Sequence, residues 1–174
     1  MPMNIDAADC TAEAILTSFV KLELPNANNH DFASQDGRRL YLDAWREFEK
    51  ESTALEHKLA VHSALGKRDS LSPTVTKVSK FVKRSREFAS RAIEVYEMFD
   101  DVLQARNDDP RAFIWLLGKP NEVRKHETAV NRKMSAAGDK IIKEYDRFWH
   151  ERELLLTQIQ VVAPQLASLI RDLS

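Results

Sequence analysis

Cysteine is nearly absent from this sequence of 174 residues, in which Cys10 is the only one. An intrachain disulfide and a cysteine-based metal site are therefore both excluded. Glycine and proline are also scarce, with 4 and 6 residues, which excludes collagen-like, linker-type and low-complexity chains. Neither sign of charge dominates, because 26 Lys and Arg stand against 27 Asp and Glu. Any nucleic acid or anionic membrane must therefore bind a local patch rather than a uniformly basic surface.

Long apolar runs are missing as well. The longest, residues 112–117, has six residues, whereas a membrane-spanning helix needs about 20. The N-terminal residues include Asp6 and Asp9 where a secretory signal would be basic. We therefore expect an intracellular protein that resides in the cytoplasm.

What the sequence does contain is 43% hydrophobic and 30% charged residues. A domain of this size buries roughly 68–70% of its unfolded surface, which is enough for a core without covalent cross-links. We expect a single helical-bundle domain over residues 1–174. Its parts are an N-terminal helix and loop over about 1–34, a core bundle over 36–163, and a short C-terminal helix over 165–174.

The few helix-breaking residues stand where helices are expected to begin or end. Asp6 or Asp9 is expected to cap a first helix that ends before Pro25. A second helix is predicted from about Asp36 to residue 65, with Gly66 as its C-cap. Its apolar stripe has alternating spacings of four and three residues and consists of Tyr41, Trp45, Phe48, Ser52, Leu55, Leu59 and His62.

A third helix is predicted to start at Ser72-Pro73, with the Ser72 hydroxyl accepting free N–H groups of the first turn. Its apolar stripe is wide enough to face two or more neighbouring helices. Its first half is basic and its second half is acidic, which opposes the helix dipole. An antiparallel pairing with the second helix compensates if the numbers of facing residues add up to about 138. This register pairs Arg38 and Arg39 with Asp100 and Asp101, and Glu47 with Arg91.

Two further helices are predicted after residue 107. Asp109 and Pro110 are expected to start a short apolar helix that ends at Gly118, and Pro120 to start a long one that reaches residue 163 and bends at Gly138. A final amphipathic piece follows Pro164. No segment alternates with the period of two that strands require. The sequence thus predicts an all-α fold, a bundle of three to four long antiparallel helices with short accessory helices.

Motifs for catalysis or cofactor binding are missing. No histidine follows a glutamate by three residues, as a di-iron bundle requires, and no His-Glu-x-x-His occurs. Phosphate-loop and Gly-x-Ser-x-Gly motifs are absent too. We therefore expect a protein that is not an enzyme, with no cofactor, no metal and no small-molecule substrate.

Two sets of residues remain as candidate binding sites. The first is an apolar element that either docks a partner or plugs the end of the bundle, and it consists of Phe113, Ile114, Trp115 and Leu116. The second is a basic stripe expected to point outward, where it either contacts phosphate groups or is a solvated face; it consists of Lys77, Lys80, Arg84 and Arg91. Trp45 and Trp149 are expected to pack into the core with their N–H groups near its boundary.

Three segments together resemble the N-terminal helical domain of fungal STAND proteins, which are NLR-like receptors. They are residues 43–49 (DAWREFE), 93–99 (IEVYEMF) and 109–115 (DPRAFIW). The resemblance covers about residues 40–160 and departs from the family at Gly118-Lys-Pro120, where the family usually continues an apolar helix. It implies an effector or signalling module that acts through association of helices, with membrane-directed cell-death activity known for some related bundles.

These observations favour a non-enzymatic interaction or signalling module that acts through protein–protein association with a protein partner or with itself, as an oligomer. The first alternative is a membrane-active bundle of the cell-death type, in which the first helix or residues 113–117 insert into an anionic membrane after release. The second alternative is nucleic-acid binding through the basic half of the third helix.

Overall fold

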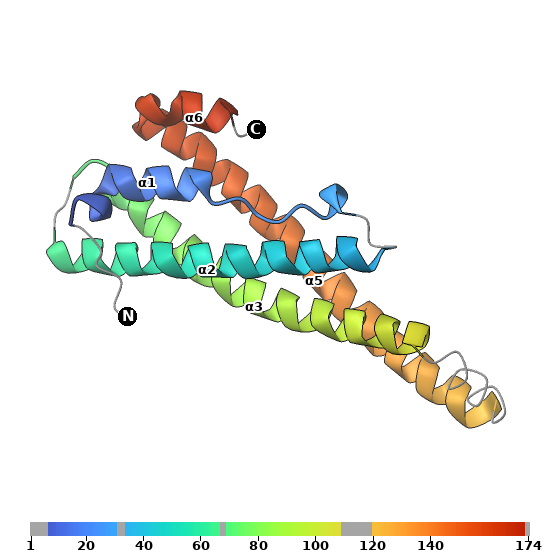
Figure 1. Cartoon of the computed structure of the whole chain (residues 1–174). Helices are drawn as coiled ribbons and strands as arrows, with labels where there is room; N and C mark the ends of the chain where they lie inside the picture. Colours follow the sequence, from blue (N-terminus) through green and yellow to red (C-terminus); the bar gives the residue numbers. More distant parts are fainter. Residues whose placement is uncertain (1–6, 31–33, 67–68, 109–119, 173–174) are drawn as a thin grey trace.

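The computed structural model describes residues 7–30, 34–66, 69–108 and 120–172, and these form an all-α bundle. The elements are a 3-10 turn η1 (Ala7–Cys10), α1 (Ala12–Lys21), η2 (Ala27–Asn29), α2 (Gln35–Leu65), α3 (Ser72–Asp108), α5 (Pro120–Val162), η3 (Pro164–Leu166) and α6 (Ala167–Asp172). Helices α2 and α3 form an antiparallel hairpin, α5 runs back along α3, and α1 lies beside the C-terminal half of α2 (Figure 1). The fold class predicted from the sequence is confirmed for this part of the chain.

The first helix begins later than predicted. Thr11, not Asp9, is the N-cap of α1, and its Oγ1 accepts the Ala14 N–H at 3.2 Å. Asp9 instead belongs to the preceding turn η1, while Asp6 is outside the described residues. The cap prediction failed because Asp9 lies in η1, the turn that places Cys10 in the core, and α1 starts only after this turn.

The second helix agrees closely with its prediction. The Ser34 hydroxyl caps its start by accepting the Gly37 N–H at 3.0 Å, and Gly66 ends it with φ of 64°. Only glycine adopts such a φ at low cost, so the predicted C-cap is confirmed. All seven residues of the predicted stripe are buried.

Ser72 lies at the start of α3 as predicted, but its hydroxyl has another role. Its Oγ accepts the Asp69 N–H at 2.9 Å and donates to Asp69 Oδ1, which also accepts the Leu71 N–H. The hydroxyl therefore stabilises the turn before the helix rather than the N–H groups of the first turn.

The antiparallel register of α2 and α3 is confirmed at its predicted end. Arg38 Nε lies 2.8 Å from Asp100 Oδ1. The prediction for Glu47 and Arg91 is wrong, because Glu47 pairs with Lys50 of its own helix and Arg91 pairs with Glu144 of α5. The reason is that Arg91 lies on the side of α3 that faces α5.

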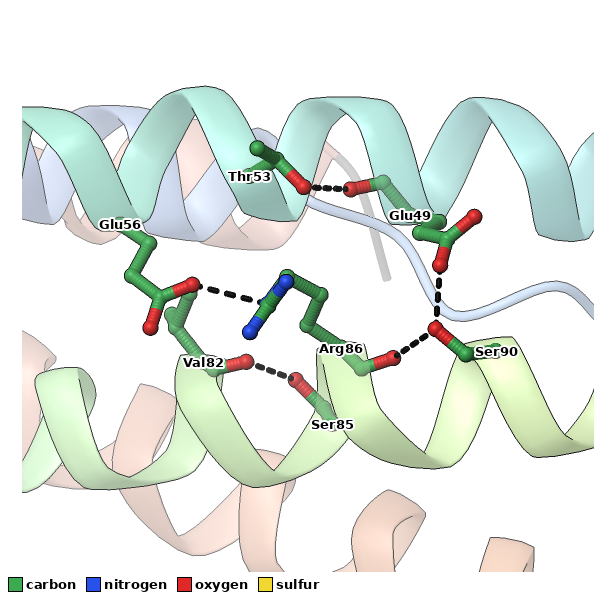
Figure 2. Close-up of polar contacts among 7 residues, drawn as sticks. All are labelled: Glu49, Thr53, Glu56, Val82, Ser85, Arg86 and Ser90. Atoms are coloured by element: carbon green, nitrogen blue, oxygen red, sulfur yellow. Dashed lines mark hydrogen bonds and ion pairs between the residues drawn. The ribbon is translucent and has the colours of Figure 1, made fainter.

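Further polar contacts join the middle of the hairpin. Figure 2 shows the Ser90 hydroxyl donating to Glu49, and the Arg86 side chain beside Glu56. Arg86 Nε is 2.8 Å from Glu56 Oε2 but does not point its N–H at the carboxylate, so this contact is an ion pair without a hydrogen bond. Fully exposed ion pairs contribute about 0.2–1 kcal/mol each, and we expect these half-buried contacts to orient the hairpin more than they stabilise it.

The core is centred on Trp45, whose side chain is fully buried. Its ring makes edge-to-face contacts with Phe88 of α3 and Tyr145 of α5. The prediction that its N–H lies near the core boundary is wrong, because Nε1 is itself buried. Contact with both α3 and α5 places the indole in the interior.

The final long helix is continuous from Pro120 to Val162, and its helical hydrogen bonding continues through Gly138. The bend expected there is therefore not seen as a break in the helix. The glycine instead faces the ring of Phe99 on α3. After Pro164, Leu166 and Ile170 are buried, so the predicted C-terminal piece covers the end of the core.

Candidate functional site

The apolar element expected to dock a partner lies outside the described residues. This concerns Phe113, Ile114, Trp115 and Leu116, together with the predicted helix start at Asp109 and Pro110. The candidate site is therefore built from the described surfaces of α3 and α5.

The basic stripe of α3 lies along α5. Lys77 Nζ donates to Gln158 at 3.0 Å, Arg84 pairs with Glu151, and Arg91 pairs with Glu144. The numbers of each pair add up to 235, so the contacts repeat every seven residues in an antiparallel register. The fourth residue, Lys80, is exposed. The stripe is exposed as expected, but three of its four members bridge to a neighbouring helix.

A surface hollow of about 320 Å³ lies on this face. Its lining has three basic and three acidic residues around one aromatic ring: Arg84, Glu87, Arg91, Glu144, Arg147, Phe148 and Glu151. The Arg84 guanidinium also lies over the Phe148 ring, 5.8 Å from its centroid. A phosphate group that enters this hollow competes with carboxylates for the same guanidinium groups. Arg84 and Arg91 are therefore already paired with carboxylates in the folded chain.

Arg152 of α5 is a buried cation that the sequence reasoning missed. Its Nε donates to the Leu22 carbonyl oxygen at 3.0 Å and its Nη2 donates to the Val20 carbonyl oxygen at 3.2 Å. Burial lowers the pKa of this guanidinium, against the opposing effect of Glu153 and Glu23. Unpaired carbonyls and the negative end of the dipole at the C-terminus of α1 stabilise the positive charge there. The residue therefore links α1 to α5. Its burial could have been predicted from the sequence, because it lies one helical turn after Phe148 in the apolar stripe of this helix.

A second hollow, of about 230 Å³, lies between α1 and α2. Its floor is apolar at Leu22 and Leu55, and its rim carries Lys21, Lys58 and Glu51. Burial raises the pKa of the Glu51 carboxyl, and the charge of Glu47 adds to this effect. Ser18 also lines the hollow, and neither a histidine nor a thiol accompanies Glu51 in this lining.

The buried histidine of the described core, His62, has a structural role. His62 is buried and its Nδ1–H donates to the Cys10 carbonyl oxygen at 2.8 Å, which fixes η1 against α2. In the part of the chain that the structure describes, no three His, Cys, Asp or Glu side chains gather closely enough to hold a metal ion. None of the described helices is long and apolar enough to cross a membrane.

The outer surface of α5 carries several exposed apolar side chains. Ile142 is 56% exposed, Trp149 40%, Leu154 51% and Val161 75%. They form two pairs with a spacing of seven residues, Ile142 with Trp149 and Leu154 with Val161, and each pair shares one side of the helix. The prediction that Trp149 packs into the core is wrong. Tyr145 fills the core position beside Trp45, and Trp149 stacks on the solvent side of Tyr145.

Acidic residues border the Ile142–Trp149 pair. Asp139, Asp146 and Glu153 are exposed and lie seven residues apart along α5. Glu153 is 3.6 Å from the Arg152 guanidinium, whereas Asp139 and Asp146 form no ion pair with the described residues. We call Ile142, Trp149, Asp139 and Asp146 the outer face of α5. It combines apolar area with two carboxylates that form no ion pair within the described part of the chain.

No protein-family model, curated protein or solved structure matches the chain. Functional inference therefore depends on the surfaces described above and on the resemblance of the sequence segments.

Proposed function

We propose that this chain is a non-enzymatic helical module that works by protein–protein association through the outer face of α5. The observation that carries the proposal is the exposure of Ile142 and Trp149 on one side of a helix that packs Ile141, Phe148 and Leu155 in the core. Tryptophan supplies large, rigid contact area and is enriched at the centres of protein interfaces. The resemblance to signalling domains of fungal STAND proteins supports the same kind of function.

The two other predicted functions have less support. Insertion of α1 into a membrane first requires the release of Ile15, Leu16 and Phe19, which are fully buried. Nucleic-acid binding through Arg84 and Arg91 requires the loss of their ion pairs with α5. Association through the outer face of α5 requires neither rearrangement.

A photo-crosslinking amino acid in place of Trp149 tests the proposal in cells that make the full chain. We expect covalent adducts with protein, because a docking surface holds its partner within reach of that side chain. The matched control is the same substitution at Leu40, which is 61% exposed on α2. Identical adducts at both positions, or none at Trp149, contradict the proposal. Leakage of anionic vesicles caused by the purified chain supports the membrane-active alternative instead.

A further inference from the structure

Charge is ordered along one column of the outer surface of α5. Arg132, Asp139 and Asp146 are all exposed and are separated by seven residues. Seven residues make nearly two full turns, so the three side chains leave the helix on one side. The column is basic at its N-terminal end and acidic at its C-terminal end. A helix with this order is complementary in charge to a second copy of itself in the antiparallel direction.

A two-fold axis at Asp139 gives this pairing a definite register. Two identical antiparallel helices then face each other so that residues at equal distances from the axis meet. Arg132 faces Asp146 of the partner subunit, and Asp146 faces Arg132 of the partner subunit. The two-fold axis thus generates two equivalent copies of the same ion pair. The two ends of the column are 14 residues apart, or about 21 Å at 1.5 Å per residue.

Apolar residues follow one flank of the charged column. Ile142 and Trp149 are both exposed and lie seven residues apart, so they leave the helix on the same side. They border the proposed contact, whereas its register is set by the charged residues of the column.

We propose that the outer face of α5 binds a second copy of this chain in an antiparallel two-fold pairing centred on Asp139. This inference rests on the proposed function and names its partner. A purely acidic column would suit a basic helix of another protein. Arg132 at the opposite end of the column makes the chain complementary to itself. Charged pairs of this kind select orientation and partner more than they add affinity.

The proposal predicts an unusual effect at the axis. Asp139 faces its own copy there, and like charges that face each other oppose association. Asp139→Asn removes this repulsion while it keeps the size of the side chain. We therefore expect this variant to dimerise several-fold more tightly than the original chain. If Asp139 instead binds a basic group of another protein, the same substitution should weaken that binding.

Sedimentation equilibrium of the full chain and of charge-reversed variants tests the register. We expect a mass of twice 20.0 kDa at low salt and a shift toward monomer as salt rises, because salt screens exposed ion pairs. Arg132→Asp and Asp146→Arg should each abolish the dimer, and the double variant should restore it. Glu94→Arg, which reverses an exposed acid of α3, is the control and should leave the mass unchanged.

The outcomes separate this inference from the proposed function. A mass of 20.0 kDa up to about 1 mM chain overturns the self-association, and so does a double variant that stays monomeric. If Trp149 still crosslinks to another protein in that case, the proposed function stands and only its partner changes. If Trp149 gives no adduct either, both proposals fall.

Discussion

Individual side chains in this core differ in how well their polar atoms are satisfied. Ser52 and Ser85 are both fully buried, in α2 and α3. The Ser85 hydroxyl donates to the Val82 carbonyl oxygen at 3.1 Å (Figure 2), whereas the Ser52 hydroxyl has no partner among the described residues. A buried hydroxyl without a hydrogen bond loses its hydration and regains nothing in return. Ser52 is thus a weak point in an otherwise apolar stripe.

Ser52→Ala should therefore raise the free energy of unfolding by about 1 kcal/mol, since it removes an unsatisfied group and adds a better helix former. Urea denaturation measures the change. Ser85→Ala is the matched control, and its gain should be smaller because it also removes a hydrogen bond. If Ser52→Ala instead destabilises the protein more than Ser85→Ala does, then the Ser52 hydroxyl has a partner and this account is wrong.

At the scale of whole elements, two glycines illustrate how local geometry decides the effect of a side chain. Gly66 ends α2 with φ of 64°, a conformation that costs roughly 1–2 kcal/mol for other residues. Gly138 lies inside α5, where a Cβ atom would be 3.5 Å from Phe99 Cζ, an ordinary contact distance. The first glycine is required by the backbone, whereas the second only weakens its helix.

Gly138→Ala should stabilise the protein by about 0.5–1 kcal/mol, because alanine reduces the entropy of the unfolded chain and fits beside Phe99. Gly66→Ala should destabilise it by about 1 kcal/mol through backbone strain. Thermal unfolding of both variants compares the two effects directly. A loss of stability in Gly138→Ala would mean that α3 and α5 pack more closely at this point than the distance to Phe99 indicates.

At the scale of the whole molecule, three tyrosines join the long helices around Trp45. Tyr41 of α2 meets Tyr96 of α3 with ring centroids 5.0 Å apart, and Tyr145 of α5 contacts Trp45. Burial raises the pKa of the Tyr41 and Tyr96 hydroxyls, and it raises the pKa of Tyr145 to about 12. The folded state therefore holds these phenols in their neutral form at a pH where the unfolded chain ionises them.

Stability should consequently fall at alkaline pH. A tyrosine in the unfolded chain ionises near pH 10, so the stabilising effect of Tyr145 is fully present below pH 10 and is lost as pH rises toward about 12. Urea midpoints on either side of pH 10 measure the decline. Tyr145→Phe lacks the ionisable group and should decline less steeply, and an equally steep decline in that variant would assign the effect to other groups.

The ion pairs between the long helices could be predicted from the sequence only in part. The Arg38–Asp100 pair was predicted because, in an antiparallel hairpin, residues whose numbers add up to about 138 face each other, and these two carry opposite charges. The Glu47–Arg91 pair failed because α3 has two charged sides, and the sequence does not state which side faces α2 and which faces α5. For the same reason the sequence did not predict that Lys77, Arg84 and Arg91, three of the four exposed residues of the basic stripe, bridge to α5.

Sequence alone determined the helical class, the stripe of α2 and the ends of that helix near Ser34 and Gly66, because these features follow from hydrophobic periodicity and from backbone preferences of neighbouring residues. Only the tertiary structure decided that Trp45 is central while Trp149 is exposed, and that Arg152 ties α1 to α5. These outcomes depend on which elements meet in space, and residues far apart in the chain settle them. The outer face of α5, on which both proposals rest, emerged only once its packed side was known.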